Sequence, residues 1–363
     1  MRLPVLGHQA AHIDEAEVGS MVGYAIEHGL NYLDTAYPYH HGQSELTIGR
    51  ILKGGYRRRI NLATKMPCRH VQSSPDFDRF LNEQLGRLQT DHIDYYLLHG
   101  LNRTQWPRLR NLGVLDWAER AKSDGRIGQI GFSFHDEFKL FKEIIDDFDH
   151  WALCQVQYNY MDNDYQAGTA GVRYAAEKGL AVVIMEPLKG GRLAKEPPSE
   201  VAAILAKAPK LRSMAGWGLQ WVWDQQEVAV VLSGMSEMKH VVENVALAER
   251  CSANRLSVEE RQLLEQVRDI YKTLSPINCT QCQYCLPCPQ GVSIPLIFQL
   301  YNEAIMYGDP EPSRNHYHGT IGLKEDQRAD RCAGCGQCES LCPQDLPIPG
   351  WLEKAHDLLR PGG

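Results

Sequence analysis

The chain has 363 residues, more than one average domain, and it carries no apolar run near the length of a membrane span. Its amino terminus lacks the basic and then apolar pattern of a secretory signal, so we expect a cytoplasmic protein with reduced thiols. The formal net charge is −7, and Lys and Arg are dispersed apart from 57–59, which argues against nucleic acid as a partner.

Before residue 273, short apolar runs alternate with amphipathic stretches, a pattern typical of repeated βα units. The predicted strands are 31–36, 60–65, 92–99, 127–133, 152–159, 180–186 and 228–233. The predicted helices lie near 14–29, 43–53, 75–90, 107–123, 136–148, 166–179 and 199–222. Seven strands alternating with helices predict a (β/α)8 TIM barrel in which one strand is missing.

The missing element is the first strand, because only residues 1–4 precede the first loop. Either the natural start lies upstream, or a neighbouring segment covers an edge that would otherwise expose unpaired backbone groups. The sequence leaves both explanations open.

Two further helices, near 238–250 and 257–273, complete this region, and 273–278 forms a plausible boundary. We therefore predict a barrel over 1–272 and a small, mainly α-helical domain over 273–363. In the second domain a helix should begin at about Pro295, which suits a first helical turn, and 308–319 has the composition of a loop.

Eight of the eleven cysteines lie in two runs within the second domain, each followed by proline. The runs are Cys279, Cys282, Cys285 and Cys288, and Cys332, Cys335, Cys338 and Cys342. Three thiolates at C-x2-C-x2-C can bind three corners of one iron–sulfur cube, while the cysteine before proline reaches the other cube.

This logic predicts two [4Fe–4S] clusters in a ferredoxin-like domain, one held by Cys279, Cys282, Cys285 and Cys342 and the other by Cys332, Cys335, Cys338 and Cys288. The first run has two residues rather than three before its last cysteine. Zinc sites and a disulfide framework are the alternatives, but zinc requires paired rather than tripled cysteines, and disulfides require an oxidising compartment.

Four polar residues follow or end three successive strands of the predicted barrel: Asp34, Tyr39, Lys65 and His99. In such barrels the active site lies at the carboxyl ends of the strands. Each residue alone could be structural, whereas all four together favour a catalytic site.

The segments NYLDTAYPYHHGQSE (31–45), ATKM (63–66) and LLHG (97–100) resemble the aldo-keto reductase superfamily. The resemblance covers residues 1 to about 272, and with the cysteine domain it extends to the branch that carries a carboxyl-terminal ferredoxin-like domain. It implies that Asp34, Tyr39, Lys65 and His99 form the family's catalytic tetrad, and the spacing from Asp34 to Tyr39 matches the family.

Acid–base chemistry assigns the roles within this tetrad. A phenol with an unperturbed pKa of about 10 donates a proton well only when its anion is stabilised. Lys65 would stabilise the Tyr39 anion, Asp34 would hold Lys65, and His99 would orient the carbonyl group. Tyr39 is the predicted general acid.

The same resemblance implies NADPH or NADH bound across the carboxyl-terminal face of the barrel without a Rossmann fingerprint. Ser133, His135 and Gln157 would surround the carboxamide. The turn formed by Glu186, Pro187, Leu188, Lys189, Gly190, Gly191 and Arg192 resembles the pyrophosphate loop. Met185, just before it, stands where many relatives place an aromatic residue that stacks on the nicotinamide. Residues Ser233, Gly234, Met235, Lys239, Glu243 and Asn244 resemble the adenosine-binding segment, where Lys239 could meet a 2′-phosphate.

These features predict an oxidoreductase that reduces a small-molecule aldehyde or ketone. Two alternatives stay open: an enzyme that passes single electrons through the clusters to or from a redox protein partner, and a non-enzymatic module that binds NADPH and senses redox state. An intact proton donor argues against the last.

Overall fold

The computed structural model describes residues 3–8, 11–279, 285–319, 322–342 and 345–361. The chain folds into two compact units. The first comprises Met1–Lys195 and Arg212–Val258, and the second comprises Glu196–Leu211 and Glu259–Gly363.

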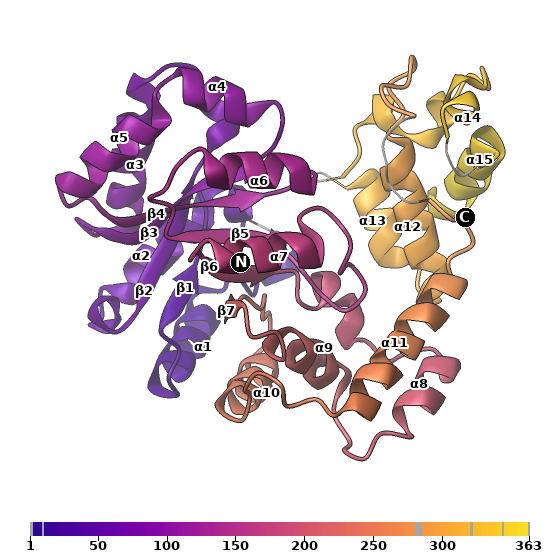
Figure 1. The fold of residues 1–363 in the computed structure, drawn as a ribbon, viewed down its shortest axis with the longest axis horizontal. Helices are drawn as coiled ribbons and strands as arrows, with labels where there is room; N and C mark the ends of the chain where they lie inside the picture. Colours follow the sequence, from indigo (N-terminus) through magenta and orange to yellow (C-terminus); the bar gives the residue numbers. More distant parts are fainter. Residues whose placement is uncertain (1–2, 9–10, 280–284, 320–321, 343–344, 362–363) are drawn as a thin grey trace. The chain divides into compact units, whose positions relative to one another are not determined.

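The first unit is built on a seven-stranded parallel sheet whose strands follow chain order (Figure 1). The strands are β1 (Tyr32–Asp34), β2 (Asn61–Met66), β3 (Ile93–Leu101), β4 (Ile127–Phe134), β5 (Leu153–Gln157), β6 (Ala181–Met185) and β7 (Val228–Val231). All seven coincide with predicted strands. The sheet is curled into a half-barrel with β1 and β7 as its outer strands, as expected for a barrel that lacks its first strand.

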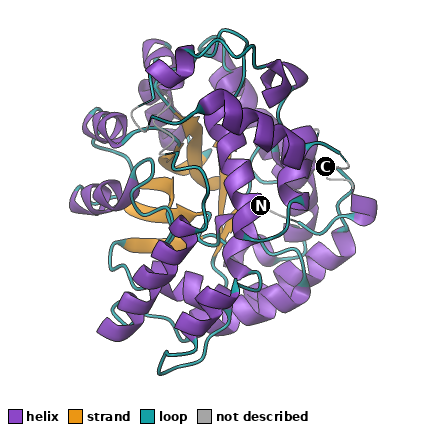
Figure 2. Cartoon of the chain, turned by 90° about the vertical axis from the view of Figure 1, so that its right-hand side faces the viewer, coloured by secondary structure: helices purple, strands orange, loops and turns teal. Residues whose placement is uncertain are grey.

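Helices cover the outer side of this sheet (Figure 2). They are α1 (Glu15–Glu27), α2 (Gln43–Leu52), α3 (Pro75–Leu88), α4 (Gln105–Asn111), α5 (Val114–Ser123), α6 (Phe138–Asp146), α7 (Gly168–Glu177), α9 (Met214–Trp223) and α10 (Met238–Glu249). Their apolar faces pack on the strands, while Tyr32, Leu97 and Val183 belong to a separate cluster inside the curled sheet. The parallel strands are thus buried on both faces, and their carboxyl ends meet at one edge.

Two predicted helices are each divided in the structure. The helix expected over 107–123 becomes α4 and α5, because Gly113 between them adopts a left-handed backbone with φ of 77°. The helix expected over 199–222 becomes α8 (Ser199–Leu205) and α9, and Pro209 lies in the segment that separates them.

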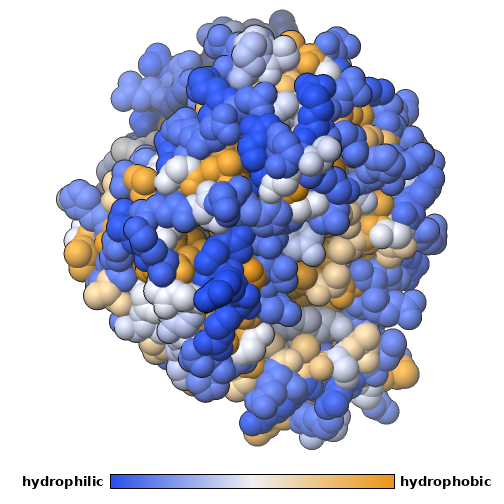
Figure 3. Space-filling view, turned by 90° about the vertical axis from the view of Figure 1, so that its left-hand side faces the viewer, coloured by the Kyte–Doolittle hydropathy of each residue, from blue (hydrophilic) through white to orange (hydrophobic). Residues whose placement is uncertain are grey.

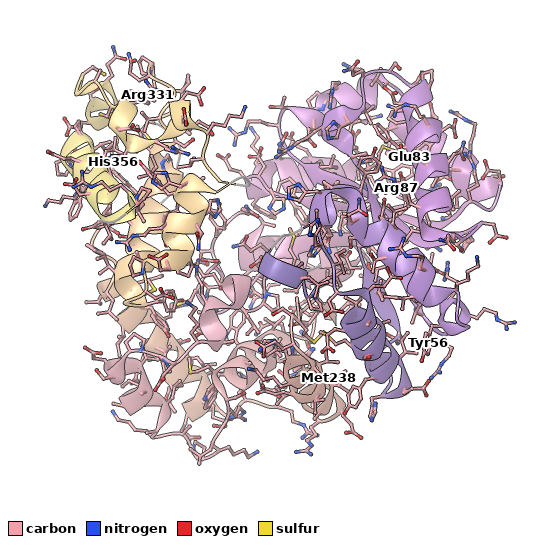
Figure 4. All side chains as sticks on the ribbon, turned by 180° about the vertical axis from the view of Figure 1, so that it is seen from behind. Tyr56, Glu83, Arg87, Met238, Arg331 and His356 are labelled. Atoms are coloured by element: carbon pink, nitrogen blue, oxygen red, sulfur yellow. The ribbon has the colours of Figure 1, made fainter. Side chains whose placement is uncertain are left out.

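The second unit is helical and contains α8, α11 (Val258–Thr273), α12 (Ile294–Met306), α13 (Glu311–His318), α14 (Gln337–Ser340) and α15 (Ile348–Leu359). The loop predicted over 308–319 is wrong, because α13 occupies most of it. Pro312 occupies the second helical position, where no backbone N–H is needed. Tyr317 of α13 is buried and its hydroxyl lies 3.0 Å from Nδ1 of His356, which Figure 4 labels.

The one face of the molecule that Figure 3 shows is mainly polar. Figure 3 shows a face on which hydrophilic residues predominate and hydrophobic residues are scattered in small groups, as on most folded proteins. Among the helices that the structure describes, none has the length and apolar character needed to cross a bilayer.

Candidate active site

The four predicted catalytic residues come together at the carboxyl edge of the sheet. Asp34 ends β1, and Tyr39 begins the short 3-10 helix η2 (Tyr39–Gly42) that follows it. Lys65 lies near the end of β2, and His99 lies near the end of β3. Parallel pairing places Lys65 opposite Leu97 of β3, so the strand ends are level and their side chains share one site.

The Lys65 ammonium group is the centre of this arrangement. Its Nζ donates to Asp34 Oδ1 at 2.6 Å and to the Thr35 carbonyl oxygen at 2.8 Å, and it lies 3.4 Å from the Tyr39 hydroxyl. The side chain is only 1% exposed. Burial alone would lower the pKa of Lys65, but the charge of Asp34 and the contact with Tyr39 outweigh it and raise that pKa. Lys65 is therefore a buried cation.

The Tyr39 phenol is protonated at neutral pH. Burial raises the pKa of its hydroxyl, and this effect is larger than the opposite effect of the Lys65 charge. The phenol thus carries its proton and lies next to a cation.

His99 is held as a neutral imidazole. Burial, followed by the positive charge of Lys65, lowers the pKa of His99 to about 3. Its ring meets the Tyr39 ring edge-on at a centroid distance of 5.9 Å. Its backbone N–H donates to the Cys68 thiol at 3.1 Å. A neutral imidazole can orient a carbonyl group without adding charge to the site.

Further side chains form hydrogen bonds with the tetrad, or with the strand that carries Lys65. The predictions from the sequence did not mark these side chains as part of the site. Gln155 Nε2 donates to Asp34 Oδ2 at 3.3 Å. Glu45 Oε1 accepts from Thr64 Oγ1 at 2.6 Å and from Gln84 Nε2 at 2.6 Å, and Gln84 Nε2 also donates to the Lys65 carbonyl oxygen at 3.0 Å. Glu45 is fully buried, so this network fixes the end of β2 from inside the protein.

A second support reaches the segment before Tyr39. The Arg87 guanidinium lies 4.0 Å from the centroid of the Tyr37 ring and pairs with Glu83 at 2.5 Å. The Tyr37 hydroxyl in turn donates to Glu83 at 3.1 Å. Figure 4 labels Glu83 and Arg87, which lie one turn apart on α3. Glu45, described above, is the last residue of the 31–45 motif that carries the family resemblance. A glutamate at that position was the one sequence signal from which its buried polar network could have been predicted.

The residues predicted around the carboxamide end the next two strands or follow them. The Ser133 hydroxyl on β4 accepts the Gly100 N–H at 2.7 Å, and Gln157 on β5 donates to Asp162 at 2.8 Å. Partial desolvation lowers the pKa of His135, and a hydrogen bond with Gln166 opposes this effect. All three lie at the same edge of the sheet as the tetrad.

The predicted pyrophosphate loop follows β6, which ends at Met185. The 3-10 helix η5 (Lys189–Ala194) contains Gly190 and Gly191 with φ of 69° and 89°, and Lys189 pairs with Asp162 at 2.6 Å. A β-carbon on Gly191 would meet nothing within 4 Å. The backbone at Gly191 is thus open to a close approach.

The predicted adenosine segment spans the residues after β7 and the first turns of α10. Asn244 Nδ2 donates to the Ser233 hydroxyl at 3.0 Å, and Glu243 accepts from Ser213. Lys239 is 73% exposed and pairs with Glu237 at 2.7 Å. Met235 packs beside the cluster formed by Met21, Ala25 and Val241.

In the second unit, five of the eight predicted cluster ligands line one pocket. Cys288, Cys332, Cys335 and Cys338 all line it, together with Cys285 and the apolar side chains of Ile294, Leu341 and Leu352. Cys279 and Cys342 pack against the same helical core, and Cys282 lies outside the described residues. Thiols beside apolar side chains are the kind of ligand and surroundings that an iron–sulfur cluster uses, while no three Cys, His, Asp or Glu side chains of the described residues are grouped closely enough to hold a metal ion.

Protein-family models match both parts of the chain. The model of the aldo/keto reductase family matches residues 5–269, and that of a 4Fe-4S dicluster domain matches residues 278–347. An uncharacterized oxidoreductase of Bacillus subtilis is 27% identical over 74% of this chain and 93% of its own. L-galactose dehydrogenase of Arabidopsis thaliana is 24% identical over 74% of this chain and 90% of its own.

Solved structures share the same fold. An aldo-keto reductase of Bacillus halodurans superposes with a TM-score of 0.60 at 26% identity, over 73% of this chain and 91% of that one. An aldo/keto reductase of Klebsiella pneumoniae, solved in complex with NADP and acetate, has a TM-score of 0.60 at 23% identity, over 74% of this chain and 90% of that one. The chain is a member of the aldo/keto reductase family, an oxidoreductase that carries a 4Fe–4S domain after its half-barrel.

Proposed function

We propose that the enzyme reduces an aldehyde or ketone with a hydride from NADPH or NADH and a proton from Tyr39. The observation that carries this proposal is the 3.4 Å approach of Lys65 Nζ to the Tyr39 hydroxyl inside a buried site. A protonated phenol beside a fixed cation is suited to protonate a carbonyl oxygen as negative charge develops on it.

Each residue of the tetrad has a distinct task. Tyr39 donates its proton to the carbonyl oxygen, and Lys65 stabilises the resulting phenolate. Asp34 keeps Lys65 charged and in place through their 2.6 Å ion pair. The neutral His99 hydrogen-bonds the carbonyl oxygen and orients it. The nicotinamide supplies the hydride when it is bound.

The residues around the tetrad suit such a cofactor. Ser133, His135 and Gln157 offer polar groups for a carboxamide at the carboxyl edge of the sheet. Gly190 and Gly191, with their positive φ values, allow backbone N–H groups to approach anionic oxygens. The other predicted cofactor contacts lie on either side of these glycines or follow the last strand. They are Met185, Glu186, Pro187, Leu188 and Arg192, and Ser233, Gly234, Met235, Lys239, Glu243 and Asn244.

We assign two [4Fe–4S] clusters to the second domain, whose boundary with the barrel we place near residue 272. Cys288, Cys332, Cys335 and Cys338 would hold one cluster, and Cys279, Cys282, Cys285 and Cys342 the other. A [4Fe–4S] centre passes one electron at a time, whereas a hydride carries two. The clusters therefore stay outside carbonyl reduction, and a reducing compartment such as the cytoplasm suits their thiolate ligands.

Isotope transfer tests the proposed reaction. We expect NADPH deuterated at C4, supplied as both C4 epimers in separate reactions with benzaldehyde, to place deuterium on the carbinol carbon with one epimer only. Mass spectrometry of the alcohol measures this. An alcohol that forms without deuterium from either epimer would exclude direct hydride transfer.

A further inference from the structure

Among the described residues at the carboxyl edge of the sheet, the Arg69 side chain is a cation without a hydrogen-bond or ion-pair partner. We propose that the Arg69 guanidinium binds a carboxylate of the substrate, so that the favoured substrates are aldehydes or ketones that carry a negative charge. This inference rests on the proposed carbonyl reduction and adds a substrate class to it.

Arg69 lies on a turn that is fixed beside the tetrad. The 3-10 helix η4 (Cys68–His70) follows β2, the strand that carries Lys65. Arg108 donates to the carbonyl oxygens of Cys68 at 2.7 Å and Val71 at 2.6 Å. The Cys68 thiol accepts the backbone N–H of His99 at 3.1 Å. The backbone on both sides of Arg69 is thus anchored next to His99.

The Arg69 side chain itself is available. Cys68 is buried, whereas Arg69 is exposed, and no residue in the described part of the chain accepts a hydrogen bond from its guanidinium or pairs with its charge. Arg103, just past the end of β3, shows the contrast, because it pairs with Asp136 at 2.5 Å. A guanidinium without a counterion matches the planar, bidentate geometry of a carboxylate.

The electrostatics of this side of the site favour an anion. Lys65 and Arg69 are among the groups whose positive charge lowers the pKa of His99. Arg69 also lowers the pKa of His135, although less strongly than burial does. Asp34 is neutralised by Lys65, and Glu186 acts on Tyr39 more weakly than Lys65 does. A carboxylate near Arg69 would therefore meet a positive field.

The test compares substrates that differ in charge and hardly in size. The probes are 3-formylbenzoate and 4-formylbenzoate, each against its methyl ester, with NADPH as reductant. The variants are Arg69→Gln, which removes the charge, and Arg69→Lys, which retains it. Arg58→Gln is the matched control, because Arg58 is also exposed and without a pairing carboxylate among the described residues but precedes β2, at the opposite end of the strand.

We expect the wild-type protein to prefer at least one formylbenzoate over its ester. Arg69→Gln should lower kcat/KM for that anion by about tenfold, mainly through KM, and leave the ester unchanged. Arg69→Lys should retain part of the preference. Added salt should weaken the preference in the wild type and in Arg69→Lys, but not in Arg69→Gln.

An anion-to-ester ratio that is the same in Arg69→Gln as in the wild type overturns the carboxylate site, and so does an equal loss in Arg58→Gln. In both cases the proposed carbonyl reduction still stands, because the esters are reduced. If the wild type reduces none of the four compounds, the proposed function fails and the carboxylate site fails with it.

Discussion

Replacing Tyr39 by phenylalanine is expected to lower kcat/KM for carbonyl reduction by about 10³-fold, within the range that a general acid contributes. The substitution removes the hydroxyl that lies 3.4 Å from Lys65 Nζ and keeps the ring that meets His99 edge-on. The affinity for NADPH should hardly change, because the hydroxyl acts on the substrate oxygen. Steady-state kinetics and a fluorescence titration with NADPH measure the two effects separately.

Tyr37→Phe is the matched control for this substitution. Tyr37 lies two residues earlier in the same segment, but its hydroxyl donates to Glu83 rather than contacting Lys65. We expect this variant to keep most of the activity. Turnover by Tyr39→Phe at the wild-type rate would remove Tyr39 as the proton donor, and equal losses in both variants would point to a general disturbance of the loop.

Cys335→Ser should lose one cluster and hence about half of the bound iron, because serine replaces a thiolate ligand poorly. Cys335 is exposed, so the substitution creates no cavity in the core, yet it lines the same pocket as Cys288, Cys332 and Cys338. Loss of the cluster should also lower the unfolding temperature of the second domain, since metal binding is coupled to its folding. Iron analysis of anaerobically purified protein measures the main effect.

Cys251→Ser provides the comparison for the iron measurement. Cys251 belongs to the first unit and lies outside both cysteine runs. The iron content of the Cys251→Ser variant should therefore equal that of the wild type. Iron content unchanged in Cys335→Ser would refute the ligand assignment, and zinc in place of iron in the wild type would refute the clusters themselves.

The strands of the half-barrel could be predicted because their apolar runs are short, rich in β-branched residues and bounded by polar turns. The position of Lys65 followed from the rule that parallel strand ends share an edge. The division of 107–123 at Gly113 did not follow, because glycine within an amphipathic stretch does not reveal its φ. The helix α13 was missed because prolines near its start have the composition of a loop.

The side chains that support the tetrad could not be predicted from the sequence, for a different reason. Gln155 reaches Asp34 across 121 positions of the chain, and Gln84 reaches Glu45 across 39. Such pairs depend on how strands and helices pack, and one sequence contains no periodicity that marks them. The same holds for Arg69, whose significance comes from its lack of a partner within the described part of the chain.

In the proposed reaction, electrons move from nicotinamide to a carbonyl group as a hydride and bypass the iron. The most direct test mixes cluster-loaded protein with NADPH under anaerobic conditions, with and without benzaldehyde, while the nicotinamide absorbance and the visible cluster band are followed together. We predict that NADPH is consumed only when the carbonyl compound is present and that the cluster band keeps its intensity. Bleaching of the cluster band by NADPH alone would contradict the proposed reaction and identify an electron-transfer enzyme.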